Sequence, residues 1–163
     1  MHIREELQIT RPLEPGHEVA LALLLTREYV ARLFDECLYE PEGISDQQFN
    51  VLRILKGGPQ DGYLVKDLRC RMIYRFADVP RLVNRLASRG LVARCENPAD
   101  RRGSRVQITA KGIALEAKMH GRHYALCQQV DRCITAEERE TLLGLLERLR
   151  NDHRSQLEAL EKG

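Results

Sequence analysis

The sequence predicts a mainly α-helical protein that carries one small β-hairpin. Of its 163 residues, 43% are hydrophobic and 31% are charged, but only 5% are aromatic. This balance is typical of a packed helical domain, and not of a disordered chain or a β-sandwich. Apolar residues recur at three- and four-residue spacing along most of the chain, and two short extended runs interrupt this pattern near residue 100.

The first helix is expected over residues 15–40. Its apolar positions follow a three-four spacing, and they are Val19, Leu23, Val30, Leu33 and Cys37. Pro41 and Gly43 then end the helix. Ser45 and Gln48 form a capping box that begins a second helix. This helix is expected to stop at Gly57-Gly58-Pro59, with a glycine in the left-handed cap position.

Two shorter helices follow. Residues 65–73 predict one helix, with Leu68 and Met72 facing inward. The next helix has the clearest apolar stripe in the chain, at i, i+3, i+4 and i+7, made by Val79, Leu82, Val83 and Leu86. Because Pro80 has no amide hydrogen, we expect the N-cap of this helix at Ala77 or later. Its opposite side carries Arg75, Asp78, Arg81, Asn84, Arg85 and Ser88.

A hairpin and two long helices complete the pattern. The runs 91–96 and 104–109 are joined by a turn rich in Pro, Asp and Gly, which indicates a β-hairpin. Thr109 is the expected N-cap of a helix to about residue 131, and Thr135 with Glu138 caps the last helix. Its inward leucines are expected to be Leu142, Leu146, Leu149, Leu157 and Leu160. The long helices have more apolar surface than the small middle region can cover, so we expect a homodimer.

The net charge of +2 conceals a strong asymmetry. Residues 64–111 hold twelve basic and four acidic side chains, a net charge of +8, and the remainder of the chain carries −6. A basic middle between acidic arms indicates a surface that meets a polyanion. The longest apolar run, residues 19–25, is far shorter than the roughly 20 residues that cross a bilayer. We therefore expect a cytoplasmic protein with no membrane partner.

Helix, turn, basic helix and charged hairpin, in this order, resemble a winged helix-turn-helix. Three motifs over residues 44–112 resemble the multiple antibiotic resistance regulator (MarR) family of transcription factors. They are the opening from Ile44 to Leu52, the run from Arg81 to Leu86 with Gly90-Leu91-Val92 after it, and Asp100-Arg101-Arg102 before Ile108-Thr109-Ala110-Lys111-Gly112. The resemblance implies a homodimeric regulator, here expected to be a repressor, that binds near-palindromic double-stranded operator DNA and is released by a small-molecule effector.

The winged helix-turn-helix geometry places the second helix of the motif in the major groove and the wing beside it. The expected DNA-binding residues are therefore Arg75, Asp78, Arg81, Asn84, Arg85, Asp100, Arg101, Arg102 and Arg105. By resemblance, Arg102 is the minor-groove arginine and Asp100 orients the wing tip. Asp78 has a second interpretation, because a carboxylate at a helix N-terminus is favourable without any DNA contact. We expect a dimerisation helix over 1–43, the DNA-binding domain over 44–111 and further dimerisation helices over 112–163.

The resemblance also implies an effector cleft between the dimerisation helices and the winged domain. Its expected lining residues are Tyr39, Phe49, Tyr74 and Tyr124, although core packing is the more ordinary use for these aromatic side chains. One sequence does not reveal the operator sequence, the regulated genes, the identity of the effector or the direction of regulation.

Other functions find less support in the residues. Gly57 and Gly62 have P-loop spacing, but Tyr63 replaces the phosphate-binding lysine, so we expect neither an enzyme nor a cofactor. A metal-sensing regulator could use Glu116, His120 and His123, which recur on one helix face, although plain surface is the more ordinary interpretation and we assign no metal site. A thiol-based redox sensor could use Cys37, but we expect the cysteines to be buried thiols. An interaction module that does not bind DNA would not need the Asp100-Arg101-Arg102 wing.

Overall fold

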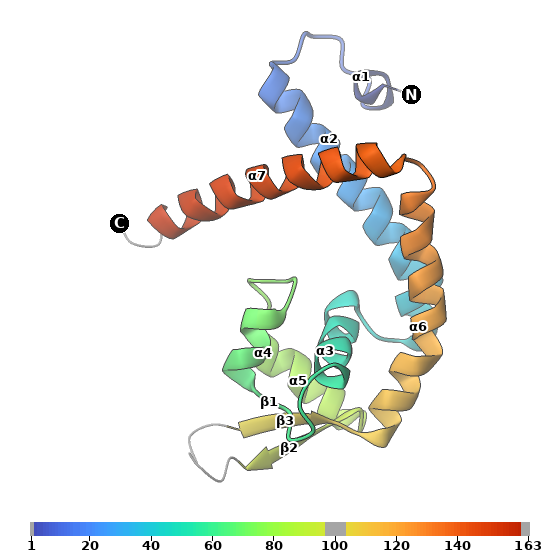
Figure 1. Ribbon diagram of the computed structural model, residues 1–163, viewed down its shortest axis with the longest axis vertical. Helices are drawn as coiled ribbons and strands as arrows, with labels where there is room; N and C mark the ends of the chain where they lie inside the picture. The colour runs from blue at the N-terminus through green and yellow to red at the C-terminus, as the bar shows by residue number, and fades with distance from the viewer. Residues whose placement is uncertain (1, 97–103, 161–163) are drawn as a thin grey trace. The chain divides into compact units, whose positions relative to one another are not determined.

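The computed structural model describes residues 2–96 and 104–160. It forms two compact units, Met1–Arg122 and His123–Gly163. The first unit contains almost all of the elements, and Figure 1 shows their course. In chain order these are α1 (Ile3–Glu6), α2 (Pro15–Phe34), η1 (Asp35–Tyr39), η2 (Glu40–Glu42), α3 (Asp46–Lys56), β1 (Tyr63–Leu64), α4 (Val65–Arg71), α5 (Val79–Ser88), β2 (Val92–Glu96), β3 (Ser104–Ile108) and the larger part of α6 (Ala110–Asp131). The second unit holds the end of α6 and α7 (Ala136–Leu160).

The long first helix ends in a wider turn than the sequence predicts. After Phe34 the backbone passes into a π-helical stretch, η1, and then into the 3₁₀ turn η2. Gly43 closes this path with φ 62°, a left-handed conformation that glycine adopts without steric cost. Such π-helical turns are frequent at functional sites. In this chain, η1 contributes to a cavity described below.

Local capping sets the other boundaries where the sequence predicts them. Ser45 Oγ accepts from the Gln48 amide at 3.2 Å, while Gln48 Oε1 accepts from the Ser45 amide at 3.0 Å. Thr135 and Glu138 exchange the same pair of bonds, at 2.8 and 3.2 Å, ahead of α7. The expected left-handed cap at Gly57-Gly58 is wrong. Gly57 has φ −82°, and the helix ends without that cap.

The middle of the first unit packs three helices on a small sheet. In Figure 1, α3, α4 and α5 lie on the same side of a three-stranded antiparallel sheet of order β1-β3-β2. The predicted hairpin is β2 and β3, with Arg94 opposite Val106. The sequence pattern did not reveal β1, which pairs with β3 through only two residues. The core between these layers is closed, and its fully buried members include Leu52, Leu68, Val83, Leu86 and Val106.

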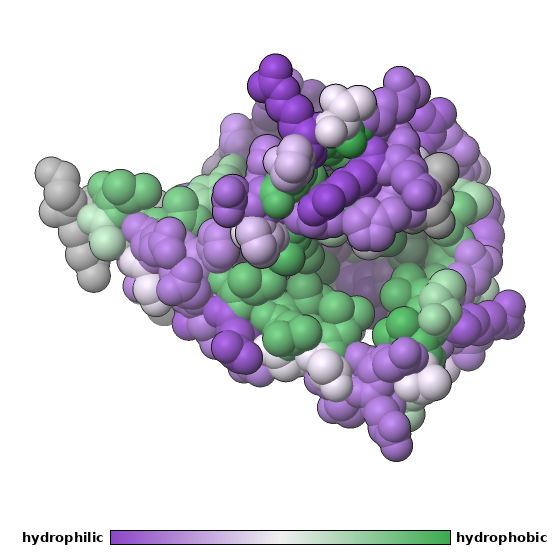
Figure 2. All heavy atoms as spheres, turned by 90° about the horizontal axis from the view of Figure 1, so that it is seen from above, coloured by the Kyte–Doolittle hydropathy of each residue, from purple (hydrophilic) through white to green (hydrophobic). Residues whose placement is uncertain are grey.

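Helices α2 and α7 expose apolar side chains and have no buried residue. In α2, Val19 is 49% and Leu24 is 65% exposed, and in α7, Leu143 is 54% exposed. Figure 2, coloured by hydropathy, shows green apolar areas between hydrophilic side chains on the face turned to the viewer. Of the α7 leucines that the sequence places inward, Leu142, Leu157 and Leu160 are exposed in the single chain and Leu146 and Leu149 are half-buried, and α7 has no fully buried residue. No helix among the described residues combines the length and the apolarity that a bilayer span requires.

Candidate nucleic-acid interface

Helix α5 is built to present one face while it buries the other. Asp78 is the N-cap, and its Oδ1 accepts from the Arg81 amide at 3.1 Å. Pro80 therefore occupies the second helical position, where no intrahelical hydrogen bond is lost, and the expected start of this helix is confirmed. The stripe from Val79 to Leu86 is buried against the neighbouring helices and the sheet. This packing fixes the orientation of α5, so that its opposite face points outward.

The outer face of α5 is cationic and exposed. Arg81, Asn84 and Arg85 are all exposed, and so are Asp78 and Ser88. Within the described residues, neither Arg81 nor Arg85 forms an ion pair that would neutralise it. Arg75 is exposed in the preceding loop, and its Nη1 donates to the carbonyl oxygen of Cys70 at 2.6 Å. Arg75 is thereby held at the end of α4, beside the beginning of α5.

The wing strands place their arginines differently from the sequence expectation. Arg105 Nε donates to the Asp61 carbonyl at 2.9 Å and its Nη2 to the Gly62 carbonyl at 2.7 Å, with an ion pair to Asp61. Much of the Arg105 guanidinium therefore holds the turn before β1. The wing tip residues Asp100, Arg101 and Arg102 lie outside the described residues.

Arg94 is a wing residue that the sequence analysis counted only as charge. Its Nη2 donates to Asn84 Oδ1 at 2.8 Å, and its Nη1 donates to Ser104 Oγ at 3.0 Å. A single guanidinium thus connects α5, β2 and β3. Strand alternation could have indicated this role, because Arg94 lies two residues after the buried Val92 and so on the same face of β2.

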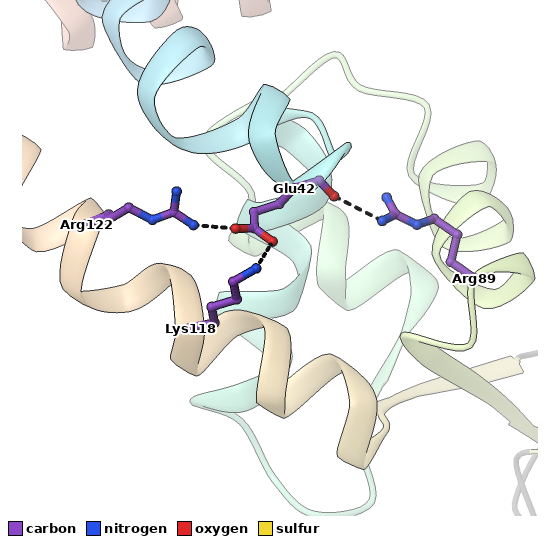
Figure 3. Close-up of polar contacts among 4 residues, drawn as sticks. All are labelled: Glu42, Arg89, Lys118 and Arg122. Carbon is purple, nitrogen blue, oxygen red and sulfur yellow. Dashed lines mark hydrogen bonds and ion pairs between the residues drawn. The ribbon is translucent and has the colours of Figure 1, made fainter.

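A second polar junction lies behind α5, at the end of η2 (Figure 3). The Glu42 carboxylate accepts from Lys118 Nζ at 2.8 Å and from Arg122, both on α6. The hydrogen bond from Lys118, together with that from Arg122, lowers the pKa of Glu42 despite burial. Arg89, which follows α5, donates to the carbonyl oxygens of Glu42 at 3.1 Å and Gly43 at 2.5 Å. The end of α5 is therefore fastened to the end of the first long helix.

A cavity of about 290 Å³ lies in the first unit. Tyr39 and Tyr74, two of the four aromatic residues expected at an effector site, line it. Phe49 does not, because it is 2% exposed and its ring packs on Tyr39 with centroids 5.7 Å apart. Tyr124 belongs to the second unit and is 60% exposed. The other lining residues, not singled out from the sequence, are Arg27, Val30, Ala31, Phe34, Asp35, Asp46 and Ile73.

The cavity combines one cationic group with two carboxylates and an aromatic wall. Burial, followed by the hydrogen bond to Asp46, raises the pKa of Tyr74. Burial also raises the pKa of Asp35, and the neighbouring Asp46 and Glu28 add to this effect. Tyr74 therefore remains a neutral hydroxyl at physiological pH. Arg27, on α2, is the cationic side chain that lines the cavity. It belongs to no recognisable sequence motif, so the sequence gave no indication of this position.

Glu116, one of the residues considered for metal sensing, already has other partners. Glu116, whose side chain is 3% exposed, pairs with Lys56 and lies 3.5 Å from His120. Across the described ranges, no group of three or more His, Cys, Asp or Glu side chains lies close enough to hold a metal ion. The expectation of buried thiols is wrong for the single chain, which lacks the contacts of any partner: four cysteines, Cys37, Cys70, Cys127 and Cys133, are exposed, and Cys95 is half-buried.

A helix-turn-helix with a cationic outer face, followed by a two-stranded wing, defines a winged helix-turn-helix DNA-binding protein. A sequence model of the MarR family matches residues 42–103, which cover the stretch from η2 through β2 to the residue before β3. Over this stretch the chain is similar to MarR-family transcriptional regulators, and the curated relatives that it matches are named as transcriptional regulators and repressors.

Three similar proteins illustrate the relationship. The homoprotocatechuate degradative operon repressor of Escherichia coli is 26% identical over 129 residues, which are 79% of this chain and 85% of that protein. The structure of a MarR mutant of E. coli in complex with operator DNA has a TM-score of 0.70 at 28% identity and covers 84% of this chain and 99% of that one. BpsR of Bordetella bronchiseptica, whose DNA binding is regulated by 6-hydroxynicotinic acid, has a TM-score of 0.70 at 25% identity and covers 82% and 98%.

Proposed function

We propose that this regulator is a cytoplasmic repressor that binds a near-palindromic operator as a homodimer. The observation that carries the proposal is the exposed cationic face of α5, which is held in place by a fully packed opposite face. An α-helix of this kind fits the major groove, where Arg and Asn side chains reach base edges. We further propose Arg75, Asp78, Arg81, Asn84, Arg85, Asp100, Arg101, Arg102 and Arg105 as its DNA-binding residues.

The contributions of these residues should differ. Arg81 faces outward from the first turns of α5 and suits base or phosphate contacts, whereas Arg105 holds the β1 turn and acts mainly by positioning the wing. Asp78 caps α5, so its carboxylate has a structural role beside any contact with DNA. Arg102 is proposed for the narrow minor groove, which attracts arginine through its negative potential.

The proposed dimer uses the exposed apolar faces of α2 and α7. Such faces are costly in water, and a second copy covers the same surface on both partners. We propose residues 1–43 and 112–163 as the dimerisation regions around a DNA-binding domain over 44–111. Static light scattering should give twice the chain mass of 18.8 kDa. A folded monomer at micromolar concentration would refute the dimer and the two-half-site operator.

The DNA-binding proposal is tested by fluorescence anisotropy with duplexes selected from a random pool. Arg102→Ala should weaken binding by about 1–3 kcal/mol per half-site and reduce the salt dependence by about one phosphate contact for each arginine lost. Arg81→Ala should change which operator positions matter. Arg11→Ala removes the same charge from an exposed position outside the basic middle and should leave both quantities unchanged. Equal behaviour of the Arg102 and Arg11 variants would contradict the assignment of the wing.

We also propose that the effector is a small hydroxylated aromatic acid that occupies the cavity beside η1. Arg27 can pair with its carboxylate, while Phe34 and Tyr39 provide an apolar wall for its ring. Asp35 and Asp46 are acceptors for ring hydroxyl groups. The names of two similar proteins support this chemistry, since one represses a homoprotocatechuate degradative operon and the other responds to 6-hydroxynicotinic acid.

The effector proposal is tested by titrating the protein–DNA complex with homoprotocatechuate and with 6-hydroxynicotinic acid. Release of DNA is expected for the wild type, and Arg27→Ala should retain DNA binding but lose release. Arg32→Ala is the matched control, because Arg32 is on the same helix but pairs with Glu36 at 2.8 Å and does not line this cavity. Normal release from the Arg27 variant would place the effector elsewhere.

A further inference from the structure

Asn84 carries an oriented amide on the face that α5 would turn toward DNA. Its Oδ1 accepts from Arg94 Nη2 at 2.8 Å. Arginine has only N–H donors, so the amide atom that faces it must be the oxygen. The NH₂ group of Asn84 is then fixed on the other side of the amide. Within the described residues, this NH₂ group donates no hydrogen bond, and the side chain is exposed.

The geometry of the hairpin explains why Arg94 can hold this position. Arg94 lies opposite Val106 in the β2–β3 register, and Ser104 is two residues from Val106 on the same face of β3. Such a diagonal cross-strand pair is within reach of a long side chain, and Arg94 Nη1 reaches Ser104 Oγ at 3.0 Å. The guanidinium is therefore fixed at two points, and it holds Asn84 through a hydrogen bond to a charged donor.

The orientation of the amide decides which base it can read. An unrestrained asparagine pairs with adenine through two bonds, in which Oδ1 accepts from N6 and the NH₂ group donates to N7. Arg94 occupies one lone pair of Oδ1 and turns this oxygen toward the wing, so the amide presents its NH₂ donor to a base edge, and the N6 amino group of adenine offers that donor no acceptor. Guanine presents two acceptors, N7 and O6, on the same edge.

We propose that Arg94 is a specificity-determining residue, which orients Asn84 as a hydrogen-bond donor so that the protein prefers guanine to adenine at the position that Asn84 contacts. This inference rests on the proposed binding of α5 in the major groove. Arg94 acts through Asn84 and through the wing, and it is a positioning residue in this role.

The test uses the full-length dimer and duplexes that the wild type selects from a random pool. Asn84→Ala first identifies the base pair that Asn84 reads, as the position at which discrimination is lost. At that position the wild type should prefer guanine to adenine by about tenfold, the scale of one good base contact. Arg94→Ala should abolish or reverse this preference. Thermal unfolding and light scattering establish that the variant remains folded and dimeric.

Two further variants separate orientation from charge and from folding. Arg69→Ala removes the same charge from an exposed position on α4 that is not among the proposed DNA-binding residues, and it should leave the ratio of guanine to adenine at that position unchanged. Asn84→Asp keeps a partner for Arg94 but replaces the donor with an oxygen, so the preference for guanine should disappear even though Arg94 is intact. This second variant tests the proposal if Arg94→Ala does not fold.

The outcomes are distinct. An unchanged ratio in Arg94→Ala, a preference for adenine in the wild type, or no position that responds to Asn84→Ala would each overturn the role of Arg94 while leaving DNA binding established. Failure of the wild type to select any duplex would instead overturn the proposed function itself.

Discussion

Replacing Glu42 with glutamine should destabilise the protein more than the same change at an exposed glutamate. The Glu42 side chain is 8% exposed and accepts hydrogen bonds from both Lys118 and Arg122. A hydrogen bond to a charged group contributes about 1.5–3 kcal/mol. The side chains of Lys118 and Arg122 are 65% and 43% exposed, so water can replace part of the hydrogen bonding that they lose in the variant. Because glutamine keeps one oxygen acceptor, we expect a net loss of about 1–2 kcal/mol in the free energy of unfolding.

The assay is urea unfolding followed by circular dichroism at one fixed protein concentration, since a dimer unfolds in a concentration-dependent way. For a chain of this length, the expected loss corresponds to a decrease of about 2–8 °C in Tm. Glu36→Gln is the matched control, because Glu36 is 56% exposed and pairs only with the 74% exposed Arg32. No measurable change is expected there.

The effect of Glu42 should also depend on pH in a defined direction. Its pKa is lowered in the folded protein by Lys118 and Arg122, so the folded state favours the ionised carboxylate. The stabilisation is therefore complete above the unfolded pKa of about 4.3 and is lost as pH falls through the lower folded pKa. The difference between wild type and Glu42→Gln should be largest near neutral pH and shrink in acid. Equal losses for the Glu42 and Glu36 variants, or a difference that grows in acid, would refute this reasoning.

Two further stability predictions follow from packing. Gly62→Ala should destabilise strongly, by more than about 2 kcal/mol, because φ is +72° and a Cβ would lie 2.0 Å from the carbonyl oxygen of Val106. Gly90 has φ +69°, but nothing lies within 4 Å of an added Cβ, so Gly90→Ala should cost only the backbone strain of about 1–2 kcal/mol. Similar urea midpoints for the Gly62 and Gly90 variants would contradict the steric argument. Lys56→Ala should lower the free energy of unfolding by up to about 3 kcal/mol, because it leaves the buried Glu116 carboxylate without its main partner. A loss below about 0.5 kcal/mol in urea unfolding would show that this ion pair is unimportant for stability.

The local part of the fold could be predicted because its interactions close within a few residues. The capping box of Ser45 with Gln48 and the start of α5 next to Pro80 are both decided by backbone amides within one helical turn. The apolar stripe of α5 likewise depends only on its spacing in the sequence. These features indicated the order of helices and the hairpin, and with them the candidate DNA-reading face.

The contacts that complete the site depend on tertiary structure. Arg89 reaches Gly43 across 46 positions, and Arg122 reaches Glu42 across 80. Arg94 meets Asn84 only because the hairpin folds back against α5. Sequence spacing does not identify such pairs, because many residues along the chain have the same hydrogen-bonding groups and could pair equally well with a long polar side chain. Packing of the apolar core selects one of them by fixing the distance, and so the tertiary structure alone decided which arginines point outward and which hold the fold together.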